Sequence, residues 1–266
     1  MTVLARWLRD RARSTAWWAL GVGLTVLVTM ALFPTLQGDG SVDDIFKDLP
    51  DSLKSAFGIS DQVSLTSAAG YLQSQLVGTM LPILLIVFGI AAGARAIGGA
   101  EEEGRLELLL ANPVTRRRVA AERALGVAVQ VVALGAATAA CTIGSAAAFG
   151  ALEDVSMPGF VVALAATTSL GLLHAAVAFA VGAAVGRRGP ALAVAAAVAV
   201  VGYLLQALGT MASVIEPLAV VSPWHWFLER NMLAEGPDWM ALLAPVAIAL
   251  VVAQAGMLRF QGRDLR

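Results

Sequence analysis

Apolar residues occur along the chain in six long runs that few charged residues interrupt. The runs cover residues 17–36, 72–97, 119–149, 159–185, 191–215 and 240–260. Each run has at least the roughly 20 residues that an α-helix needs to cross a bilayer. The runs are too long and too continuously apolar for the alternating strands of an outer-membrane barrel. The pattern therefore predicts an all-α fold, a polytopic membrane protein with six transmembrane helices.

Composition supports a chain that lives in a bilayer. Charged residues make up 14% of the sequence, hydrophobic residues 58%, and the mean hydropathy is +0.77. A soluble globular domain has roughly 25% charged residues. No internal repeat or low-complexity linker divides the sequence, so we expect residues 1–266 to form a single transmembrane domain.

The positions of the basic residues predict the orientation of the chain. Of the 18 Lys and Arg residues, only Lys47, Lys54 and Arg230 fall in one set of loops, and the rest fall in the other set. Lys and Arg close to a span stay in the cytoplasm. Both termini and residues 98–118 are therefore expected to be cytoplasmic, and the loops at 37–71, 150–158 and 216–239 to be outside.

The basic N-terminus followed by an apolar run also has the form of a secretory leader. The run ends in LFPTLQGDG without a small-residue cleavage site, which favours an uncleaved first span. Residues 3–18 are compatible with two interpretations. They could lie along the inner membrane surface with Trp7 in lipid, or they could be a basic tail that only sets topology.

The segment EEEGRLELLLANPVTRRR, residues 101–118, is the most highly charged stretch of its length. Leu106, Leu109 and Leu110 recur at helical spacing, which predicts a short amphipathic helix over 101–111. Pro113 ends this helix, and Thr115 is expected to cap a new helix that starts at Arg116. The segment is compatible with an ordinary solvated loop or with a docking helix for a soluble partner, in which carboxylates set register and leucines enter a groove.

This segment resembles the cytoplasmic motif E-E-x-G-x-L-E-x-L-L-x-x-P-x-[ST]-R of ABC exporter permeases of the transport-permease type, the ABC-2-like membrane subunits with the type V exporter fold. The resemblance continues in DDIFKDLPDSLKSAFG (43–58), TMLPILLIVFGIAAGARAI (79–97), SPWHWF (222–227) and the C-terminal FQGRDL. Arg105 departs from the motif, because the family usually has Thr at this position.

The resemblance implies a permease with six spans that dimerises, most simply as a homodimer, and that works with two cytoplasmic ATPase subunits. It places a coupling helix at about 101–111, between spans 2 and 3. The residues it assigns to docking of the ATPase subunit are Glu101, Glu102, Glu103, Gly104, Leu106, Glu107, Leu109, Leu110, Pro113 and Arg116.

The chain lacks the means to hydrolyse ATP. A Walker A loop needs a Gly before its Lys, whereas Lys47 follows Phe46 and Lys54 follows Leu53. We therefore expect no cofactor on this chain, with ATP and Mg bound by the partner ATPase. The sequence also has no zinc motif, since His174 and His225 are the only histidines, and we expect no metal site.

Polar residues inside the apolar runs are candidates for a substrate path. Gln206, His174 and Gln130 could line such a path, or they could join helices through hydrogen bonds. Gln206 is the preferred candidate, because the resemblance places the fifth span near the dimer axis.

Cys141 has no partner for a disulfide and is expected to be a packing residue. Gly89 and Gly93, spaced four apart, favour close helix packing rather than a dedicated dimer contact.

Two outer segments have amphipathic or aromatic patterns. Residues 43–57 are expected to lie flat on the outer surface or to cover the exit. Residues 216–239 are rich in Pro and Trp, which favours short helices at the outer interface. Within them, Pro223, Trp224 and Trp226 are candidates for an outer gate.

Two classes of function fit the sequence. The first is the permease subunit of an ATP-driven exporter in a bacterial plasma membrane, moving amphiphilic molecules such as drugs, antibiotics or lipids outward. The second is a secondary transporter or channel driven by an ion gradient, with His174 and the buried glutamines as a relay. The motif at 101–118 favours the first class. A membrane-embedded enzyme would need a nucleophile and a base at suitable spacing, which the sequence lacks, and nothing in it indicates binding of nucleic acid.

Overall fold

The computed structural model describes residues 3–36, 67–209 and 216–264, and over these ranges six helices are long and apolar enough to cross a membrane. The described residues form helices joined by turns. The number of spans predicted from the apolar runs is thereby confirmed. The outer segment 43–58 lies outside the described residues. The six spanning helices are α1 (Val3–Leu36), a composite helix over residues 68–102, α8 (Arg116–Ala148), α9 (Met157–Val185), α10 (Arg188–Gly209) and α14 (Trp239–Gln261).

All six of these helices start before the predicted runs. The first continues back to Val3, the second covers 68–102 instead of 72–97, and the third starts at Arg116. Charged residues in a first or last turn satisfy helical geometry as well as apolar ones do, so hydropathy alone ends a helix too early. The described part of the fifth span ends at Gly209, short of the expected residue 215.

The second span contains two stretches of π-helix. It runs through α4 (Ala68–Tyr71), the π-helical η1 (Leu72–Met80), α5 (Leu81–Ala94), the π-helical η2 (Arg95–Gly99) and α6 (Ala100–Glu102). A π-helix is rare, and it occurs often at functional sites. The apolar run at 72–97 did not indicate these π-helical stretches, because the apolar pattern carries no signal for wider turns.

The fourth span, α9, is the centre of the bundle and packs against α5, α8, α10 and α14. Glycines bring it close to its neighbours. A Cβ on Gly89 would lie 2.3 Å from the carbonyl oxygen of Gly171, and one on Gly93 would lie 2.2 Å from that of Ala175. On α14, Gly256 is pressed against Ala180 in the same way. The glycine pair of α5 therefore serves packing within the chain.

The first span packs along α8. Its N-terminal end is anchored there, because the backbone N–H of Leu4 donates to Oε2 of Glu122 at 2.7 Å. Residues 3–18 are the first turns of one continuous helix, and they do not form the separate surface helix that the sequence left open.

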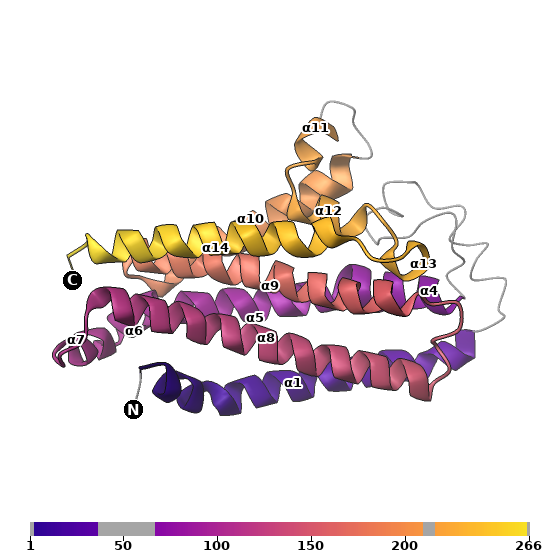
Figure 1. Cartoon of the computed structure of the whole chain (residues 1–266), viewed down its shortest axis with the longest axis horizontal. Helices are drawn as coiled ribbons and strands as arrows, with labels where there is room; N and C mark the ends of the chain where they lie inside the picture. Colours follow the sequence, from indigo (N-terminus) through magenta and orange to yellow (C-terminus); the bar gives the residue numbers. More distant parts are fainter. Residues whose placement is uncertain (1–2, 37–66, 210–215, 265–266) are drawn as a thin grey trace.

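The start of α1 and the end of α14 lie at the same end of the bundle as α6 and α7 (Arg105–Leu110), as Figure 1 shows. The opposite end carries α11 (Glu216–Ala219), α12 (Pro223–Leu228) and α13 (Met232–Glu235). We call the end of the bundle that carries α6 and α7 the basic end. Its described basic residues are Arg6, Arg9, Arg11, Arg13, Arg95, Arg105, Arg116, Arg117, Arg118, Arg123, Arg187, Arg188, Arg259 and Arg263.

Candidate functional site

The motif that was predicted as one helix over 101–111 consists of two helices separated by a left-handed turn. The composite second span ends at Glu102, Gly104 adopts φ 66° and ψ 2°, and α7 starts at Arg105. Only glycine adopts this conformation without steric cost. The expected continuous helix was therefore wrong, and the glycine explains why. The break lets α7 point away from the axis of the second span.

Three of the four leucines of α7 face the bundle rather than the solvent. Leu106 is fully buried, and Leu109 and Leu110 are half-buried against the same core. The expectation that these three leucines enter a groove of a partner is therefore corrected for Leu106. Leu108 occupies the opposite face and is 74% exposed. The motif does not assign Leu108 to docking, although its spacing from Leu106 places it away from the packed face.

Glu101 is buried inside the basic end instead of being available for docking. Its carboxylate accepts two hydrogen bonds from the guanidinium of Arg263, in the loop after α14, one of them from Nη1 at 2.9 Å. Arg263 also donates from Nε to the carbonyl oxygen of Ala183, near the end of α9, at 3.1 Å. This ion pair ties the second span to the fourth and the last. The role of Arg263 was not anticipated from the C-terminal motif.

The start of the third span follows the prediction. Thr115 caps α8, with its hydroxyl accepting the N–H of Arg118 at 3.2 Å, and the helix begins at Arg116. Pro113 is exposed in the turn before it. Arg116 donates through Nη1 to the carbonyl oxygen of Arg263, so it supports the same network as Glu101.

The docking residues expected from the motif thus divide into two groups. Glu101, Leu106 and Arg116 hold the basic end together. An exposed surface remains around α7, formed by Glu102, Glu103, Glu107, Leu108 and Pro113. We call this the α7 surface. Its carboxylates can complement basic groups of another protein, and Leu108 adds one large apolar side chain among them.

At the opposite end, the motif SPWHWF packs α12 onto α10. Ser222 donates its hydroxyl to the carbonyl oxygen of Gly202 at 2.7 Å and also caps α12. Nδ1 of His225 lies 2.9 Å from Oε1 of Gln206. Trp224 is buried and meets the ring of Tyr203 edge to face, with centroids 5.2 Å apart.

The candidates for an outer gate are therefore part of a fixed contact. Pro223 is half-buried in the first turn of α12, and Trp226, half-buried, donates from Nε1 to the carbonyl oxygen of Val220 at 2.7 Å. Residues 216–239 do form short helices, as expected.

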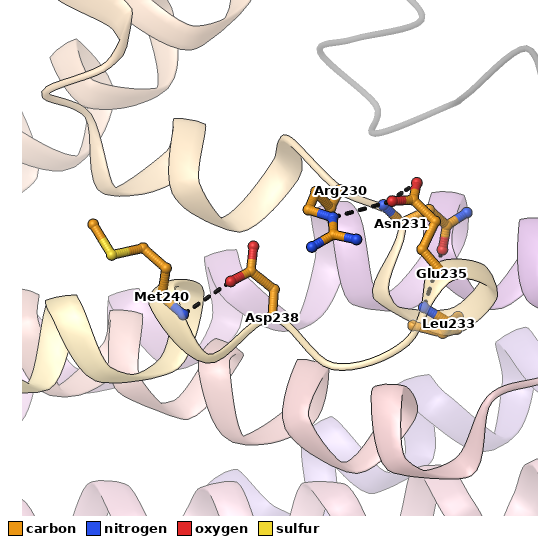
Figure 2. Close-up of polar contacts among 6 residues, drawn as sticks. All are labelled: Arg230, Asn231, Leu233, Glu235, Asp238 and Met240. Carbon is orange, nitrogen blue, oxygen red and sulfur yellow. Dashed lines mark hydrogen bonds and ion pairs between the residues drawn. The ribbon is translucent and has the colours of Figure 1, made fainter.

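Hydrogen bonds also fix the connection from α12 to α14, as Figure 2 shows. Arg230 donates to Glu235 at 3.1 Å, and the side chain of Asn231 accepts the N–H of Leu233 at 3.1 Å. Asp238 caps α14 by accepting the N–H of Met240 at 2.9 Å. Local caps and one ion pair thus hold the connection between α12 and α14.

The three candidates for a substrate path do not come together. Gln206 belongs to the α10–α12 contact. His174 is buried in α9 and bonds through Nδ1 to the carbonyl oxygen of Leu170 at 2.8 Å. Gln130 is buried in α8 beside a small cavity of about 20 Å³ that Arg11, Arg95 and Trp18 also line. Within the described residues, no cluster of three or more His, Cys, Asp or Glu could hold a metal ion.

A family model described as "ABC-2 family transporter protein" matches residues 1–265. No curated protein matches the chain.

Proposed function

The chain belongs to the ABC-2 family of transporter proteins, and from this premise we propose that it is the permease subunit of an ATP-driven exporter. Members of this family are membrane transport components that normally work with an ABC ATPase. The chain is a multi-pass membrane protein. The cell membrane of a bacterium is the proposed location.

The observation that carries the proposal is the α7 surface. Glu107 and Leu108 are exposed on α7, the short helix that Gly104 joins to the second span, and Glu102 is exposed at the end of that span. A helix of this length is stable only when it packs on something, and its leucine side already packs on the bundle. The remaining acidic face is free to meet a separate ATPase. By the distribution of Arg and Lys, this end faces the cytoplasm.

The contacts of the basic end suggest how a push on α7 would reach the spans. Glu101 lies in the last turn of the second span, where Arg263 donates hydrogen bonds to its carboxylate. Arg263 lies close to the C-terminus and also donates to the carbonyl oxygen of Ala183 in α9. Because these contacts join α6, α9 and the end of α14, a displacement of α7 would move three spans together. We propose that nucleotide-driven motion of the ATPase enters the membrane domain by this route.

The cargo is proposed as an amphiphilic small molecule moved outward, since the spans offer apolar surfaces with few polar groups. Two copies of the chain, as a homodimer, would enclose the path together with two ATPase subunits. The alternative, an ion-driven secondary transporter, would need a relay, and the structure keeps His174, Gln130 and Gln206 in three separate environments.

Charge reversal on the α7 surface tests the proposal. We expect Glu102→Lys with Glu107→Lys to lower the stimulation of the partner ATPase at least tenfold, because like charges that face each other at a contact cost several kcal/mol. The measurement is ATPase activity of the copurified complex in liposomes. Glu153→Lys, an exposed glutamate before α9, is the matched control. Full coupling in the double variant would refute the proposed role of α7.

A further inference from the structure

A cleft opens at the basic end between the start of α1, α7 and the start of α8. The volume of this cleft is about 280 Å³. A cavity that holds a single water molecule needs only about 10–15 Å³. Four arginines line the cleft: Arg6, Arg11, Arg105 and Arg123. Asp10 is the one carboxylate among its described lining residues. The cleft therefore carries an excess of positive charge around a space that a small molecule can enter.

Trp7 fixes the position of two of these arginines. It is buried and packs on Gly126, where a Cβ would lie 2.4 Å from Cδ1 of the indole. The guanidinium carbon of Arg123 lies 4.4 Å from the ring centroid, and that of Arg11 lies 4.9 Å from it. Cation–π contacts hold both charges beside one neutral ring, but they do not neutralise them.

The hydrogen-bonding capacity of the cleft is also incompletely used. Nε of Arg123 is buried and has no hydrogen-bond partner among the described residues. Arg105 pairs with Glu103, yet its side chain is still 51% exposed. Buried donors in native proteins nearly always have an acceptor. An anionic ligand with several oxygens would supply acceptors and negative charge at once.

The depth of the cleft in the bundle points to the source of the anion. Leu4 is bonded to Glu122, and Gly23 lies against Cys141, so α1 and α8 run side by side with a constant offset. The apolar part of α8 starts immediately after Arg123. The cleft thus lies where the helices pass from charged to apolar residues, at the level of lipid headgroups.

We propose that this cleft binds a phosphate group, and that its source is the headgroup of an anionic phospholipid in the leaflet at the basic end. The planar guanidinium matches phosphate oxygens in bidentate geometry. Trp17 is 70% exposed and lies on the same face of α1 as Arg6, about three helical turns further along the chain. Leu20 and Leu24, both exposed, follow it. This row offers a surface for the acyl chains of the bound lipid.

Occupation of the cleft would affect α7. Arg105 begins this helix, and Leu108 and Leu109 also line the cleft. A phosphate held by Arg105 together with Arg11 and Arg123 would fasten α7 to α1 and α8.

The test uses the purified full-length chain in neutral detergent, with the thermal unfolding midpoint measured against added phosphatidylglycerol, phosphatidylcholine or inorganic phosphate. We expect phosphatidylglycerol to raise the midpoint more than either of the others. Arg6→Gln and Arg123→Gln should each weaken the response to phosphatidylglycerol about tenfold, the effect of losing a charge-assisted hydrogen bond. Arg6 is exposed, so its substitution should not affect folding if that of Arg123 does.

Arg117→Gln is the matched control, because Arg117 is an exposed arginine of α8 that does not line the cleft. An equal response to inorganic phosphate that depends on Arg6 and Arg123 would support the phosphate site and overturn the lipid source. A response that Arg117→Gln reduces as much as the cleft variants do, or no response at all, would overturn the site itself.

Discussion

At the residue scale, adjacent glutamates of one motif have opposite roles. Glu101 is buried against Arg263, whereas Glu102 is exposed on the α7 surface. Removing one partner of a buried ion pair leaves an uncompensated charge, which costs far more than losing a surface charge. In the sequence EEEG, a residue of a buried ion pair is thus followed directly by a residue of the α7 surface.

Neutral substitutions separate these roles. We expect Glu101→Gln to lower the free energy of unfolding by about 1–3 kcal/mol. The reason is that Arg263 then lacks its counter-charge. Glu102→Gln should change stability by less than about 0.5 kcal/mol. Thermal unfolding in detergent measures both, at roughly 2–4 °C per kcal/mol. The double variant Glu101→Gln with Arg263→Gln should lose less than the two single losses added together; strict additivity would mean that the pair does not interact.

At the element scale, spacing predicted which residues of α7 share a face but not what that face contacts. The bundle and the groove of a partner offer leucine the same apolar surroundings, so the pattern of Leu106, Leu109 and Leu110 cannot distinguish them. The start of α8 was predicted correctly, because Pro113 and Thr115 act through local geometry. The ion pair of Glu101 with Arg263 joins residues 162 positions apart, and no local rule indicates it.

The contact of α12 with α10 provides an element-scale prediction. His225 and Gln206 are bonded, whereas His174 is satisfied within its own helix. A double-mutant cycle of His225→Ala and Gln206→Ala should therefore give a coupling energy of about 1 kcal/mol in unfolding, and the cycle of His174→Ala and Gln206→Ala should give a value near zero.

The second cycle also tests the secondary-transporter alternative. A proton relay through His174 and Gln206 requires the two side chains to interact, so a coupling of His174 with Gln206 as large as that with His225 would favour that alternative over the exporter.

At the scale of the whole molecule, four of the other five spans pack against α9, and α1 packs along α8. Both described ends of the chain lie with α7 at the basic end (Figure 1). The number of spans could be predicted from hydropathy, because the thickness of the bilayer fixes the length of a spanning helix. The clustering of arginines at one end could be predicted because basic residues favour one side of a membrane. The order of packing around α9 depends on glycines such as Gly89 and Gly93. Among the described glycines, six have no heavy atom within 4 Å of the place where a Cβ would lie, so composition alone does not identify the close contacts.

The central claim is that a separate ATPase drives this membrane domain through the α7 surface. Site-specific crosslinking tests it most directly, since Cys141 is the only cysteine and Cys141→Ser gives a cysteine-free background. Leu108→Cys reports from α7, and Trp239→Cys, exposed at the opposite end, is the control. We expect that, in native membranes, Leu108→Cys crosslinks to a protein with a Walker A sequence and Trp239→Cys does not. Labelling of Leu108→Cys from outside the cell, or crosslinking of the ATPase at Trp239→Cys alone, would contradict it.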